Sequence, residues 1–71
     1  MKTGMLWFDG SGKPLIEQVR AAADYYQRKY GAKPNRAFAP AGTESTTVDG
    51  IQVTGDKSVL PKHLWLGVED K

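Results

Sequence analysis

The chain has 71 residues, of which ten are basic and eight acidic, and it contains no cysteine. This length allows a single domain over residues 1–71 with one small core, and the lack of cysteine excludes disulfides and thiolate metal sites. A formal net charge of +2 is too small to indicate nucleic-acid binding by charge alone. Because no apolar run reaches the roughly 18 residues of a membrane-spanning helix, we expect a cytoplasmic protein with no membrane segment.

The first predicted element is a strand over residues 5–8. This apolar run consists of residue types that favour strands, and the turn residues at 9–12 end it. Its unbroken apolar character indicates a strand covered on both faces, or one that places Trp7 on a second, partly exposed face.

Residues 14–31 carry the one long helical pattern of the chain. Pro14 suits the first helical turn, Gly31 suits the position just past the end, and Pro34 prevents continuation. Apolar residues recur at steps of three and four, which predicts a single buried stripe. The residues of this stripe are Leu15, Ile16, Val19, Ala22, Ala23, Tyr26 and Tyr30.

A second strand is predicted at residues 36–39, directly after the turn that follows the helix. A strand, a helix and another strand form a crossover, which we expect to be parallel and right-handed. Residues 40–48 show no apolar periodicity, so we expect a mobile loop there.

The alternating residues 51–54 predict a half-buried strand, which follows the Asp49-Gly50 turn signal. Gly55-Asp56 allows two interpretations. It can be a hairpin loop that joins 51–54 to 57–60, or a bend, with the chain reversal at residues 60–63.

Residues 64–68 form the last predicted strand, with Trp65 on the face opposite Leu64 and Leu66, and we expect residues 69–71 to fray. The resulting order, β-α-β-β-β, predicts an α+β fold in which one amphipathic helix packs on a small mixed sheet.

The two tryptophans, Trp7 and Trp65, are the first candidate site. If one faces the helix, the other can lie on the open face of the sheet, where exposed aromatic side chains commonly contact other proteins. Burial of both is the simpler alternative. We therefore expect a non-enzymatic protein-interaction or adaptor module, which binds a protein partner or forms a homodimer.

A nucleic-acid-binding accessory protein is the alternative function, because cations and aromatic side chains are interleaved at the end of the helix. Such cations can hold phosphates while aromatic rings stack on bases, although two of them also suit the helix dipole. The candidate nucleic-acid or anion contacts are Lys13, Tyr25, Arg28, Lys29, Lys33 and Arg36.

Lys13 also ends a glycine-containing turn, residues 9–13, which could hold an anion at the helix N-terminus. A phosphate-binding P-loop needs a glycine where Trp7 stands, and Pro14 follows Lys13. An ordinary turn that begins a helix is therefore the more natural interpretation.

His63 lies near Asp56, Ser58 and Lys62 in the sequence, which supplies the side-chain types of acid–base or nucleophilic chemistry. A domain of this size offers little room for a cleft, so we predict no catalytic residues. With one histidine and scattered carboxylates, we expect neither a metal nor a cofactor.

In residues 6–9, in residues 23–31 followed by Pro34 and Asn35, and in residues 58–69, the chain resembles a group of small uncharacterised bacterial proteins from Chloroflexi-type genomes. The similarity covers most of the chain apart from the loop near residues 40–48. It implies a free-standing bacterial protein. The group has no assigned activity, so the resemblance carries over no functional residue.

Overall fold

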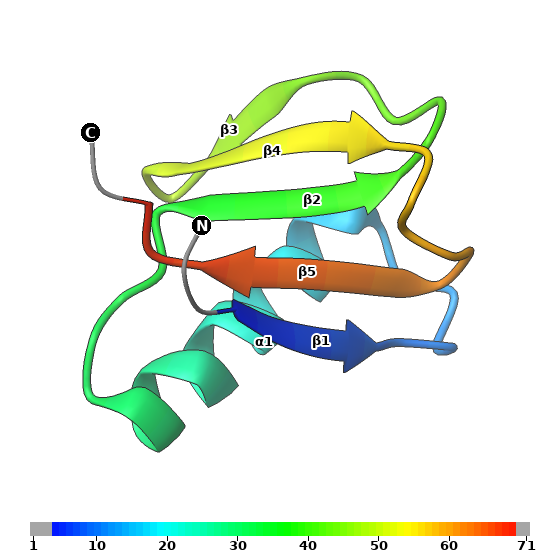
Figure 1. Cartoon of the computed structure of the whole chain (residues 1–71). Coiled ribbons are helices and arrows are strands. Elements are labelled where there is room, and N and C mark those ends of the chain that lie inside the picture. Colours follow the sequence, from blue (N-terminus) through cyan, green and yellow to red (C-terminus); the bar gives the residue numbers. More distant parts are fainter. Residues whose placement is uncertain (1–3, 70–71) are drawn as a thin grey trace.

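The computed structural model describes residues 4–69, which form one helix and five strands (Figure 1). The elements are β1 (Gly4–Phe8), α1 (Leu15–Tyr30), β2 (Arg36–Pro40), β3 (Thr46–Val48), β4 (Ile51–Asp56) and β5 (His63–Gly67). The strands form one mixed sheet in the order β1-β5-β2-β4-β3, and α1 packs on one of its faces. The predicted α+β class, with a single helix on a small mixed sheet, is confirmed. Within the described residues, no helix has the length and hydrophobicity needed to cross a membrane.

The helix ends where the sequence predicts. Gly31 adopts a left-handed φ of 74°, and its N–H donates to the carbonyl of Gln27 at 2.8 Å. Only glycine adopts this conformation without a steric cost from a Cβ atom, so the end of α1 is determined locally. Pro14 stands just before the first helical residue, where its missing N–H removes no intrahelical bond.

The buried stripe of α1 is narrower than predicted. Val19, Ala22 and Tyr26 are buried, whereas Ile16 and Tyr30 are about half exposed, which corrects the expectation for these two residues. Ile16 lies on the flank of the stripe, because successive helical residues are about 100° apart. Tyr30 lies in the last turn, which projects beyond the β1 edge of the sheet (Figure 1), and its ring packs on Tyr26 instead.

The core lies between α1 and the sheet. Alternate residues of each strand point to the helix, as expected for a sheet with one covered face. Two of these residues are alanines in β2, and their small side chains leave room for the helix. The sheet residues of the core are Met5, Ala37, Ala39, Val48, Ile51, Val53, Leu64 and Leu66.

The strand–helix–strand unit differs from the predicted crossover in one respect. β1 and β2 are both antiparallel to β5, which lies between them, so the two strands are parallel but not adjacent. The direct parallel neighbour of β2 is β4. The last strand of the chain thus lies between the two strands that a simple crossover would place side by side.

A strand that the sequence pattern missed ends the expected loop at residues 40–48. Residues 46–48 form β3, which pairs with β4 across a turn in which Asp49 and Gly50 have φ of 51° and 82°. Two left-handed residues are typical of the tight two-residue hairpin turn. The pattern missed this strand because Val48 is its only buried residue, and one apolar residue has no periodicity.

Of the two interpretations of Gly55-Asp56, the structure shows the second. β4 continues through both residues, and the chain reverses between Asp56 and His63 before it enters β5 beside β2. Gly55 lacks a Cβ where the loop between β2 and β3 approaches closely: a Cβ there would lie 2.8 Å from the carbonyl oxygen of Thr43. This glycine therefore marks a close backbone approach rather than a hairpin turn.

Glu69, which the sequence assigns to the frayed tail, is held in the structure. Its N–H donates to Oδ1 of Asn35 at 2.8 Å, and its carboxylate pairs with Arg36 at 3.0 Å. Residues 70–71 lie outside the described residues. A hydrogen bond and an ion pair therefore hold the chain in place as far as Glu69.

Candidate functional site

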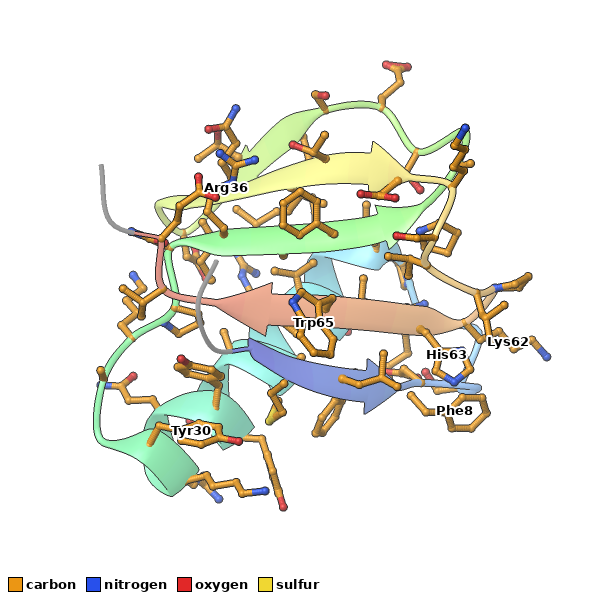
Figure 2. All side chains as sticks on the ribbon, in the orientation of Figure 1. Phe8, Tyr30, Arg36, Lys62, His63 and Trp65 are labelled. Atoms are coloured by element: carbon orange, nitrogen blue, oxygen red, sulfur yellow. The ribbon has the colours of Figure 1, made fainter. Side chains whose placement is uncertain are left out.

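An apolar surface lies on the face of the sheet opposite α1. Leu6 on β1 pairs with Trp65 on β5, and Trp65 pairs in turn with Phe38 on β2. Residues paired across neighbouring strands point to the same face, so these three side chains form one row. Leu6 is 59% exposed and Trp65 38% exposed. Figure 2 shows Trp65 near the centre of this face.

Leu60 extends this row from the loop between β4 and β5, where it is 66% exposed. We call Leu6, Phe38, Leu60 and Trp65 the open-face patch. Scattered single apolar side chains are ordinary on protein surfaces, but contiguous ones mark binding sites. The four side chains come from four separate segments of the chain and line one groove.

The groove has a volume of about 380 Å³. The open-face patch and Val59 supply its apolar lining, while Asp56, Ser58 and His63 supply polar groups. His63 stacks against Phe8 at one end, with 5.1 Å between the ring centroids (Figure 2). An apolar floor with a few convergent polar groups is the usual composition of a binding site.

The position of Trp65 depends on Gly4. A Cβ at residue 4 would lie 2.5 Å from Cε2 and Nε1 of the Trp65 indole. The indole therefore lies over the backbone of β1, in space that any other residue at position 4 would occupy. This contact orients the largest side chain of the open-face patch.

The structure places the two candidate tryptophans on opposite faces of the sheet. Trp7 is half-buried beneath α1, and its ring packs against Tyr25 with 5.3 Å between centroids. It does not belong to the open-face patch. The sequence pattern indicates Trp65 but not Leu6 or Phe38, because only the strand order shows that these two residues are its neighbours.

The basic residues proposed to contact nucleic acid are not gathered in one place. Lys13 precedes the helix and Arg28 and Lys29 end it, so α1 separates them by about 24 Å at 1.5 Å per residue. Arg36 lies in β2 on the open face of the sheet, away from Tyr30 at the helix end (Figure 2).

Several of these cations already have partners within the protein. Arg28 forms an ion pair with Asp24 at 2.9 Å, and Arg36 pairs with Glu69 at 3.0 Å. Lys33 donates to the carbonyl of Asp49 at 2.6 Å. Lys29 lies over the ring of Tyr30, at 5.5 Å from its centroid. These contacts hold the four side chains to local structure of the protein.

In the turn at residues 9–13, the carboxylate of Asp9 accepts a hydrogen bond from the turn's own backbone. The N–H of Ser11 donates to the Asp9 carboxylate at 2.9 Å, and the N–H of Lys13 donates to the Ser11 hydroxyl at 3.2 Å. Hydrogen bonds to the Asp9 carboxylate from the Ser11 hydroxyl, and secondly from the Ser11 N–H, lower the pKa of Asp9. Two N–H donors of this turn, those of Ser11 and Lys13, are therefore engaged by the protein's own side chains.

Asp56, Ser58 and His63 do meet in the groove, but not in the order of a catalytic triad. The Ser58 hydroxyl donates directly to Asp56 at 2.7 Å, and His63 Nδ1 donates to the carbonyl of Pro61 at 2.8 Å. Among the described residues, no hydrogen bond joins Ser58 to His63. In a catalytic triad the histidine contacts the nucleophilic hydroxyl. Here the Asp56 carboxylate, and not His63, contacts the Ser58 hydroxyl.

The three side chains instead give the groove a polar rim. Two hydrogen bonds from Ser58, the hydroxyl bond first and the N–H bond second, lower the pKa of Asp56. Because the carbonyl of Pro61 can only accept a hydrogen bond, Nδ1 of His63 is the donor in their contact. Residues 4–69 hold no cluster of three His, Asp or Glu side chains suited to a metal ion.

Comparisons of this chain with protein-family models, with curated proteins and with solved structures give no match.

Proposed function

We propose that this protein is a non-enzymatic interaction module that binds a protein partner through the open-face patch. The observation that carries the proposal is the row formed by Leu6, Trp65 and Phe38 on three adjacent strands. All three side chains point away from the core, and the row borders a groove of about 380 Å³. Aromatic and apolar side chains grouped in this way supply most of the binding energy in protein–protein contacts.

The rigidity of the patch supports this function. Leu6, Phe38 and Trp65 stand on paired strands, and the Trp65 indole is held over Gly4. A partner therefore meets side chains carried by backbone that is already paired in the sheet, so binding need not order that backbone. The groove can receive an apolar side chain, while the Asp56 carboxylate can accept hydrogen bonds from donors beside it.

The preferred ligand on this basis is a segment with a large apolar side chain next to a hydrogen-bond donor. The nucleic-acid alternative has less support, because the structure disperses its candidate contacts over both ends of α1 and over β2. Trp65 could also stack on a nucleic-acid base. A salt titration distinguishes this case from a protein ligand, because binding of nucleic acid weakens steeply with salt.

A displayed library of random peptides, selected against the wild-type protein, tests the proposal. We expect selected peptides to bind the Trp65→Ala variant at least about tenfold more weakly, since truncating a central aromatic hot spot costs about 2 kcal/mol or more and each 1.4 kcal/mol is about tenfold. The matched control is Ile16→Ala, which truncates an exposed apolar side chain on the helix and should leave binding unchanged.

Amide chemical shifts locate the ligand directly. Peptide-induced shifts at residues 6, 38 and 65 would agree with the proposal. Equal binding to both variants, or shifts confined to α1, would refute it. Binding of single-stranded DNA that weakens steeply with salt, with no peptide selected, would instead favour the nucleic-acid role.

A further inference from the structure

β1 is an edge strand whose outward main-chain groups are not used by the rest of the sheet. The N–H of Asp9 donates to the carbonyl of Lys62 in line with the β1–β5 pairing. Since main-chain groups alternate in direction along a strand, those of Gly4, Leu6 and Phe8 point away from β5. No strand within residues 4–69 pairs with this side of β1, which forms the lower edge of the sheet in Figure 1.

This edge lacks the features that usually prevent pairing with another chain. Natural edge strands carry a lysine, a proline, a bulge or an inward-pointing charge. β1 has the sequence Gly-Met-Leu-Trp-Phe, with no charge and no proline, and its register with β5 is uninterrupted over five residue pairs. The opposite edge, β3, is only three residues long.

The edge is complementary to a second copy of itself. In an antiparallel pair centred on Leu6, Gly4 of each copy stands opposite Phe8 of the other. All three outward-facing residues then exchange N–H and C=O bonds with the second copy, as in the hydrogen-bonded positions of an antiparallel ladder. A two-fold axis through Leu6 generates this register without any shift.

The side chains fit this register as well. Phe8 is 62% exposed, and it would stand opposite a residue that has no side chain. The indole of Trp65 already lies over Gly4, so Phe8 of the second copy would pack beside it. Because β1 carries no charge, two copies meet there without charge repulsion between the paired strands.

We infer that two copies of this chain associate through antiparallel β1–β1 pairing, with Leu6 on the two-fold axis. The two sheets become continuous, and Phe8 of each copy extends the open-face patch of the other. A single five-residue strand pair buries less than the roughly 1,200 Å² of a stable interface, so the dimer is weak, with a dissociation constant above about 1 µM. The inference stands independently of any protein ligand on the open-face patch.

Single cysteines provide the test, because the chain has none of its own. In the proposed dimer, the Leu6→Cys variant places two thiols opposite each other, with Cα atoms about 5.5 Å apart, within disulfide range. Phe8→Cys is the matched control: its position is equally exposed, but it stands opposite Gly4 of the second copy. We expect the Leu6→Cys protein to form a disulfide dimer at least about tenfold faster, and to lose this advantage in denaturant. Equal rates, or faster oxidation of Phe8→Cys, would overturn the inference.

A second measurement leaves every side chain intact. Methylation of the Leu6 amide nitrogen in a synthetic chain removes an outward N–H, while the β1–β5 bonds remain. Sedimentation velocity over a concentration series should show at least about tenfold weaker association than in the unmethylated chain. A wild-type protein that stays monomeric at millimolar concentration, or a methylated chain that associates equally well, would also overturn the inference.

Discussion

The indole ring of Trp65 lies over Gly4, with a hypothetical Cβ at residue 4 only 2.5 Å from the ring. The two residues stand at opposite ends of the chain, and the antiparallel pairing of β1 with β5 brings them together. The exposed aromatic surface therefore depends on a glycine that has no role in a turn.

Replacement of Gly4 by alanine should destabilise the protein by about 1–3 kcal/mol, because the new methyl group must displace the indole or the strand. Urea denaturation measures this change. In the Trp65→Ala background the same substitution should cost much less, since the obstructing ring is gone. A penalty of equal size in both backgrounds would show that the ring does not lie where the structure places it.

The buried face of α1 can be tested with neighbouring alanines. Ala22→Asp puts a charge in the core and should lower the free energy of unfolding by about 3–5 kcal/mol. Ala21→Asp is the matched control, because Ala21 is exposed and the helix propensity of the new residue is the same. We expect it to change stability by less than about 1 kcal/mol. Similar melting temperatures for both variants would mean that α1 presents another face to the sheet.

The Asp56 carboxylate gives a prediction about pH. Its pKa lies below the ordinary value of 3.8, chiefly because the Ser58 hydroxyl donates to it. Ser58→Ala should raise the pKa of Asp56 toward 3.8, as measured by carboxyl carbon shifts in an NMR titration. The pKa of Asp9, which Ser11 lowers in the same way, should not move and serves as the internal reference.

The same bond sets the direction of the stability change. A carboxylate whose pKa is lower in the folded state stabilises the protein at pH values above its unfolded-state pKa. This contribution disappears as the pH falls through the folded-state pKa. Wild type should therefore exceed Ser58→Ala in stability near neutral pH, and the difference should shrink below about pH 3.8. A difference that grows on acidification would contradict the assignment.

The turn between β3 and β4 should depend on the conformation of Gly50. Its φ is 82°, and a Cβ there would meet only Lys33 Nζ, at 3.9 Å, so alanine is opposed by backbone strain and not by lack of space. Gly50→Ala should cost about 1–2 kcal/mol in thermal or urea unfolding. Gly50→Asn, which tolerates the left-handed region better, should cost less. If both substitutions were neutral, the turn would have to differ from the one described.

Local structure can be predicted from the order of the amino acids alone. Pro14 and Gly31 bracket α1, and the alternation of apolar residues in β5 predicts that Trp65 points away from the core. These features depend on backbone sterics and on residue period, which act over a few neighbouring positions. The helix, four of the strands and the overall class could therefore be predicted.

Which segments lie side by side depends on long-range packing. Insertion of β5 between β1 and β2 gathers Leu6, Phe38 and Trp65 into one row, places Trp65 over Gly4 and leaves β1 at the edge. Strand order depends on how all the strands pack together against one helix, and it cannot be predicted from the residue pattern of any single strand. The candidate surface belongs to that long-range arrangement, so only one of its four residues could be named from the sequence.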